Sequence, residues 1–106
     1  MKESEKRVTD GAVCLAKRLV SDISAAAEKY NVKKVILFGS RARGSSRERS
    51  DIDLAVQGGD VDGFFLELQE NAHTLLSFDV VDLDQTGSDE LKKVIFREGV
   101  VLYEKA

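Results

Sequence analysis

Two short stretches hold the residues best suited to chemistry. Gly39 and Ser40 follow the apolar run 35–38. Glycine has no Cβ, so a phosphate can approach the backbone closely, and the hydroxyl and N–H of Ser40 lie at a predicted helix start. We therefore consider Gly39 and Ser40 as candidate phosphate-binding residues. Taken alone, Gly-Ser after a strand is more often a turn and a helix cap.

Asp51 and Asp53 follow Ser40 after a gap of ten residues. In a strand both carboxylates would project from one face, about 6.6 Å apart, because side chains alternate between faces. Two like charges held this way repel unless a cation lies between them. Mg²⁺ typically takes one or two carboxylates plus substrate phosphates, and two such ions about 4 Å apart can stabilise attacking and leaving oxygens. The pair could also be the solvated face of an edge strand, but the neighbouring Gly-Ser favours metal-dependent phosphoryl transfer.

A third carboxylate is available in the stretch 77–83, as Asp79 or Asp82. The two are an odd number of residues apart, so in a regular strand they face opposite ways and only one can join Asp51 and Asp53. We choose Asp79, because it lies deeper in the apolar run, where an unpaired charge is costly. Its expected role is to ligate a metal ion and to receive, or help orient, the proton of an attacking hydroxyl. For both residues, ordinary polarity at a strand end is the alternative.

The loop between Ser40 and Asp51 is rich in arginine, and its cations could pair with a triphosphate. Of these we select Arg41 as a nucleotide-binding residue, because it is closest to Ser40. The four arginines of this loop are Arg41, Arg43, Arg47 and Arg49. His73 and Cys14 have no neighbouring ligands or catalytic partners in the sequence, so neither a zinc site nor a catalytic thiol is supported.

These residues need a scaffold, and the apolar periodicity predicts one. A long amphipathic helix is expected at about 5–30, followed by strands at 35–38 and 51–56. A helix at 61–75, capped by Asp60, precedes a strand at 78–83, and a helix at 88–98, capped by Ser88 and ended by Gly99, precedes a strand at 100–103. This order predicts an α/β (α+β) fold, a small mixed sheet flanked by helices. We expect a single domain over 1–106, with the catalytic core at about 33–104.

Composition narrows the possible classes of protein. The chain has 106 residues, 42% hydrophobic, enough for one core and too few for two ordinary domains. A net charge of -3 gives no bulk electrostatic reason to bind nucleic acid. A single cysteine and the absence of an apolar run near the roughly 20 residues of a membrane helix favour a cytoplasmic protein without a membrane span.

Gly39-Ser40, the gap of ten, Asp51-x-Asp53 and a later strand carboxylate together resemble the signature of the DNA polymerase β-like nucleotidyltransferase superfamily, in its minimal nucleotidyltransferase branch. The likeness covers 35–83, and the ending 98–103 is also similar to that branch. The resemblance implies a polymerase β-like palm fold. It also implies that Gly39 and Ser40 hold the NTP phosphates, that the aspartate pair binds two Mg²⁺ ions, and that Asp79 completes the site.

Members of this branch resemble the antitoxin half of a two-gene module whose other half is a helical HEPN-domain RNase toxin. The resemblance implies transfer of NMP, with AMP from ATP as the expected case, to an acceptor hydroxyl on a HEPN partner, with release of pyrophosphate. The alternative hypothesis is a non-catalytic binding module that neutralises a HEPN partner by forming a complex. The sequence leaves open whether the chain forms a homodimer.

Overall fold

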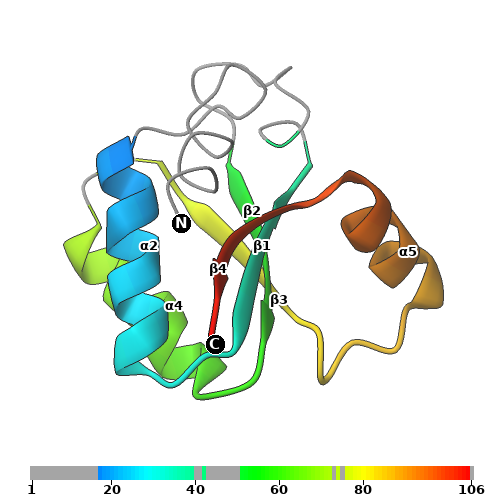
Figure 1. The fold of residues 1–106 in the computed structure, drawn as a ribbon, viewed down its shortest axis with the longest axis horizontal. Helices are drawn as coiled ribbons and strands as arrows, with labels where there is room; N and C mark the ends of the chain where they lie inside the picture. Colours follow the sequence, from blue (N-terminus) through cyan, green and yellow to red (C-terminus); the bar gives the residue numbers. More distant parts are fainter. Residues whose placement is uncertain (1–16, 40–41, 43–50, 73, 75, 106) are drawn as a thin grey trace.

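The computed structural model describes residues 17–39, 42, 51–72, 74 and 76–105 (Figure 1). Within them the predicted order of elements is confirmed, and the first part of the predicted N-terminal helix lies outside them. The elements are α2 (Lys17–Lys29), β1 (Lys34–Phe38), β2 (Ile52–Gln57), α4 (Val61–Asn71), β3 (Phe78–Asp82), α5 (Asp89–Glu98) and β4 (Val100–Glu104).

The four strands form one sheet in the order β3-β2-β1-β4. The central strand β1 is antiparallel to both β2 and β4, whereas β2 and β3 run parallel. A parallel pair needs a crossover connection, and α4 supplies it here. The prediction of a small mixed sheet is therefore confirmed.

The two faces of the sheet are covered differently, as Figure 1 shows, with α2 and α4 on one side and α5 on the other. Alternate residues of β2 enter the larger core beneath α2 and α4, where Ile52, Leu54 and Val56 are fully buried. Ala55 points the other way, into a smaller core with Ile36 of β1 and residues of α5. Because side chains alternate along a strand, Asp53 belongs to the α5 face.

Local chemistry fixes where the helices begin and end. Asp60 caps α4 by accepting a hydrogen bond from the Gly63 N–H at 3.0 Å, and the Ser88 hydroxyl accepts one from the Leu91 N–H at 3.2 Å at the start of α5. Gly99 ends α5. The predictions of both caps and of this helix end are confirmed.

The predicted extent of α4 was wrong by several residues at its end. The helix stops at Asn71, because Ala72 adopts an extended backbone with ψ 146°. The N–H of Ala72 still donates a hydrogen bond to the carbonyl of Leu68 at 3.1 Å, as in a helix. The apolar residue Ala72 therefore fits the helical spacing in the sequence, although it lies one position after the last helical residue. Leu75, which we had counted in this helix, lies outside the described residues.

The helices α2 and α4 are joined at their surface by a hydrogen-bonded ion pair, Lys29 Nζ to Glu67 Oε1 at 3.0 Å. This contact lowers the pKa of the Glu67 carboxyl and raises the pKa of the Lys29 ammonium. The Lys29 side chain is 59% exposed, so water screens the pair and it contributes little to stability. Among the described residues, no helix is long and apolar enough to cross a membrane.

The larger core predicts a stability difference between two leucines. Leu54 is 0% exposed and Leu66, on the outer side of α4, is 54% exposed. We expect Leu54→Ala to lower the free energy of unfolding by about 2–5 kcal/mol, because it leaves a cavity. Leu66→Ala should change it by less than about 0.5 kcal/mol. Urea unfolding monitored by circular dichroism measures both, and equal losses would contradict this assignment of the core.

Candidate active site

The strand register aligns two predicted site residues, Asp53 and Asp79, with Phe38 in one row across the sheet. Phe38, the last residue of β1, is opposite Asp53 of β2, and Asp53 is in turn opposite Asp79 of β3. Residues paired in this way share a face of the sheet. We call Phe38, Asp53 and Asp79 the carboxylate row. It lies on the α5 face, at the end of the sheet where β1 stops.

Gly39 stands directly beside this row. Its φ of 78° lies in the left-handed region, which glycine adopts without strain. A Cβ placed on Gly39 would collide with the carboxylate of Asp53. Its carbonyl accepts a hydrogen bond from the Ala42 N–H at 3.2 Å, which marks a turn directly after β1. The missing side chain therefore makes room for Asp53 in the folded chain.

This role of Gly39 was missed by the sequence analysis, which treated the glycine as an approach for phosphate. The contact is long-range and depends on the pairing of β1 with β2. Only the positive-φ preference of glycine after a strand gives a local signal. The two roles are compatible, because a backbone without a side chain stays accessible beside the carboxylate.

Asp51 lies just outside the row. The sequence analysis placed it in the second strand, but β2 begins at Ile52, and Asp51 is an exposed residue one position earlier. The reason is the length of the neighbours, since β1 ends opposite Asp53 and β3 begins opposite Ile52. No described strand extends far enough to pair with Asp51.

Asp79 and Asp82 face opposite ways, as the sequence predicted. Asp82 is paired in register with Val56, whose side chain is fully buried in the core beneath α2 and α4. Its Oδ1 accepts a hydrogen bond from the Asp84 N–H at 2.9 Å, so it shapes the turn after β3. Asp79 alone of the two shares the row with Asp53.

The burial that we inferred for Asp79 from its place in an apolar run was wrong. Asp79 is exposed, because β3 is an edge strand and the carboxylate points to the α5 face. No burial penalty is needed to explain its charge. Its accessibility instead suits a group that must meet a substrate arriving from solvent.

The carboxylates of Asp53 and Asp79 could bind Mg²⁺ if a nucleotide supplied the remaining ligands. Within the residues that the structure describes, no group of three or more His, Cys, Asp or Glu side chains converges as a metal site. The row nevertheless supplies two carboxylates, from Asp53 and Asp79, at adjacent register positions. Mg²⁺ usually binds through one or two carboxylates while substrate phosphates and water complete its shell. The residues present thus suit an ion that arrives together with a nucleotide.

Several predicted residues cannot be placed against this geometry. Ser40 and Arg41, both predicted to bind nucleotide, lie outside the described residues. The same holds for His73, Cys14 and the remaining loop arginines, Arg43, Arg47 and Arg49.

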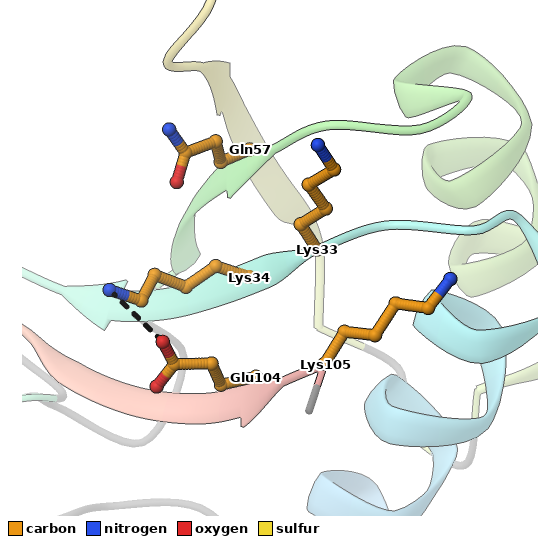
Figure 2. Close-up of a pocket in the computed structure, with 5 residues that line it drawn as sticks. All are labelled: Lys33, Lys34, Gln57, Glu104 and Lys105. Carbon is orange, nitrogen blue, oxygen red and sulfur yellow. Dashed lines mark ion pairs between the residues drawn. The ribbon is translucent and has the colours of Figure 1, made fainter.

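A hollow of about 330 Å³ lies at the opposite end of the sheet (Figure 2). Lys34 is paired with Gln57 there, four register positions from Phe38 and Asp53, or roughly 13 Å along the strand. Figure 2 shows the ammonium groups of its three lysines pointing apart. The hollow is lined by Lys33, Lys34, Gln57, Glu104 and Lys105.

Two of these lysines already have partners. Lys34 Nζ lies 3.6 Å from Glu104 Oε2, and Lys105 Nζ donates a hydrogen bond to Asn31 Oδ1 at 2.5 Å. Because the cations diverge and are partly neutralised, they offer no common point for a phosphate. The carboxylate row is the stronger candidate for the active site.

Fold and site together define a nucleotidyltransferase. A model of the family described as polymerase beta, nucleotidyltransferase matches residues 21–106, and the chain belongs to this family. A protein of Methanocaldococcus jannaschii, provisionally named a protein adenylyltransferase, is 40% identical over an alignment of 92 residues, and the match covers 76% of this chain and 90% of that protein.

Two further relatives extend the comparison. Protein adenylyltransferase MntA of Thermococcus cleftensis is 34% identical over 77 residues, covering 69% of this chain and 77% of MntA. A crystal structure of a toxin–antitoxin with AMP-PNP contains a chain that is 26% identical, with a TM-score of 0.66, over 81% of this chain and 73% of that one. The predicted nucleotidyltransferase fold is thus confirmed.

The contact between Gly39 and Asp53 yields a prediction with a matched control. Gly39→Ala should weaken Mg²⁺-ATP binding by about 10- to 100-fold, because the new Cβ displaces the Asp53 carboxylate. It should also lower the free energy of unfolding by about 1–3 kcal/mol, owing to backbone strain. Isothermal titration calorimetry and urea unfolding measure the two effects.

The control is Gly87→Ala, since a Cβ at Gly87 would meet no atom within 4 Å. This variant should bind Mg²⁺-ATP like the wild type. Equal affinities of the Gly39 and Gly87 variants would refute the importance of the Gly39 contact.

Proposed function

We propose that this nucleotidyltransferase moves AMP from ATP onto a hydroxyl of a partner protein, a HEPN-type toxin, and thereby acts as its antitoxin. The observation that carries the proposal is the register that sets Asp53 and Asp79 side by side, with Gly39 against Asp53. A pair of adjacent carboxylates beside an accessible backbone suits a nucleotide that brings its own metal ions.

The choice of AMP and of a protein acceptor draws support from the relatives. MntA of T. cleftensis is named a protein adenylyltransferase, and the toxin–antitoxin structure contains AMP-PNP, an analogue of ATP. The exposure of Asp79 on an edge strand is consistent with a large acceptor, because a macromolecule can bring its hydroxyl to that edge without entering a deep pocket.

In the proposed reaction the acceptor oxygen attacks the α-phosphorus of ATP, an O–P bond forms, and the bond from that phosphorus to the bridging oxygen of the β-phosphate breaks. Pyrophosphate leaves, and the acceptor hydroxyl gives up its proton. Asp79 takes or orients this proton, since it is the carboxylate most open to the acceptor. Gly39 lets the phosphates lie against the backbone, and Ser40 and Arg41 are proposed to bind them.

Asp53 and Asp79, with Asp51 at the start of β2, would hold Mg²⁺. Ions bound there would neutralise charge on the attacking and leaving oxygens. Asp53 is the central ligand in this proposal, because it is the member of the row that borders both Gly39 and Asp79.

The carboxylates give the most direct mutational test. With ATP labelled on the α-phosphate, Mg²⁺ and a purified HEPN-type toxin as acceptor, Asp53→Asn and Asp79→Asn should each reduce labelling of the toxin by at least about 100-fold. Asp51→Asn should also abolish transfer. Asp82→Asn is the matched control: it should transfer normally, because Asp82 faces the opposite side of the sheet and its amide oxygen can keep the turn hydrogen bond.

Full labelling by Asp53→Asn would overturn the proposed role of the row. If no NTP labels the toxin while Asp53→Asn still neutralises it, the chain acts as a binding module that blocks the toxin by occlusion. Circular dichroism of each variant shows whether the fold is intact.

A further inference from the structure

The helix α5 presents an unusual outer side. Its inner side packs against the sheet through Ile95, which is 0% exposed, and through Leu91. Residues four positions apart lie on the same face of a helix, so two adjacent pairs of this spacing form one stripe on the opposite side. The stripe contains Lys92, Lys93, Phe96 and Arg97, which we call the α5 patch.

Phe96 is 60% exposed, more than the two other large apolar side chains that stand out to solvent in the described part of the chain, Leu66 and Val101. The patch borders an open hollow of about 660 Å³, which Asp89 also lines. One exposed phenylalanine is ordinary. Phenylalanine and arginine are both enriched at protein interfaces, and Phe96 and Arg97 stand side by side here on an exposed helix surface.

The cations of the patch are largely available. Within the described ranges Lys92 and Lys93 form no ion pair. Arg97 lies 3.8 Å from Glu98, and its side chain is still 69% exposed. The α5 patch therefore presents three positive charges on a chain whose net charge is -3.

The location of α5 links the patch to the active site. Figure 1 shows α5 on one side of the sheet, with α2 and α4 on the other. The packing of Ile95 against Ile36 and Ala55 places α5 on the face that carries Asp53 and Asp79. Of the described helices it is the one on that face, so a protein that brings a hydroxyl to Asp79 approaches the side of the sheet where α5 lies.

We propose that the α5 patch is the docking surface for the acceptor protein and that it binds an acidic segment carrying an apolar side chain. Carboxylates of this segment pair with Lys92, Lys93 and Arg97, and its apolar group packs on Phe96. This inference rests on the proposed transfer to a protein and adds where, and by what chemistry, the acceptor is held.

Charge favours an acidic protein segment over a nucleic acid as the occupant. The chain as a whole is acidic, and Asp89 and Glu90 lie in the first turn of the same helix. A phosphate backbone carries regularly spaced charge and gains affinity mainly from a continuous basic surface. The separate carboxylates of a protein segment can each lie beside one of the three cations, and none of them has to lie against Asp89.

The test uses the whole chain without ATP and a fluorescein-labelled peptide of alternating glutamate and leucine, followed by fluorescence anisotropy. We expect the peptide to bind, and Phe96→Ser or Lys93→Glu to weaken its affinity by about tenfold. Leu66→Ser, at an apolar site of α4 that is 54% exposed, and Lys33→Glu, at the far end of the sheet, should leave the affinity unchanged.

Three results would overturn the docking proposal: no binding of the glutamate–leucine peptide, equal binding by Phe96→Ser and wild type, or stronger binding of a lysine–leucine peptide or of an RNA oligonucleotide. Asp53→Asn should bind the peptide normally. The peptide assay contains no nucleotide, so a failure of the peptide to bind would contradict the docking proposal and leave the proposed AMP transfer untouched. A failure of labelling would contradict the transfer and leave the peptide result valid.

A kinetic readout separates docking from catalysis. In the labelling assay, Phe96→Ser should raise the KM for the toxin by about tenfold and leave kcat and the affinity for ATP unchanged. A fall in kcat with unchanged KM would instead assign Phe96 to the reaction centre and contradict docking.

Discussion

The close approach of the Asp53 carboxylate to the bare α-carbon of Gly39 is the constraint on which the site depends. The left-handed backbone at Gly39 ends β1, and the glycine leaves room for the carboxylate of the residue opposite Phe38. Because β2 also pairs with β3, the same register brings Asp79 beside Asp53. Gly39 therefore leaves room for the carboxylate of Asp53, and the pairing of β2 with β3 places a second carboxylate, that of Asp79, next to it.

The unequal cover of the sheet makes this constraint useful. Two helices bury one face in a continuous apolar core, which holds the strands in place. The other face has a smaller core under α5, so charged groups such as Asp53 and Asp79 can lie there without full desolvation. The parallel edge strand β3 adds a carboxylate that is open to solvent. A stable scaffold and an accessible reaction edge thus come from opposite faces of the same four strands.

Sequence reasoning predicted the parts of this structure that are set locally. The caps at Asp60 and Ser88 and the end of α5 at Gly99 follow from side chains within a few residues. The contact of Gly39 with Asp53 and the place of Asp51 outside β2 could not be predicted, because both depend on where strands far apart in the chain stop pairing. Asp79 was chosen for a burial it does not have, since sequence does not reveal that β3 is an edge strand. Phe96 falls outside the apolar periodicity of its helix, and only the fold shows which face it borders.

Paramagnetic broadening of the amide signals by Mn²⁺-ATP, recorded by NMR on the isotopically labelled chain, tests the central claim most directly. Mn²⁺ takes the oxygen ligands that suit Mg²⁺ and quenches signals of nearby nuclei. The account predicts that Gly39, Asp53 and Asp79 lose intensity at the lowest additions, while Lys34 and Gln57 at the opposite end of the sheet keep theirs. Loss of the Lys34 and Gln57 signals first, or uniform loss along the sheet, would contradict a nucleotide site at the carboxylate row.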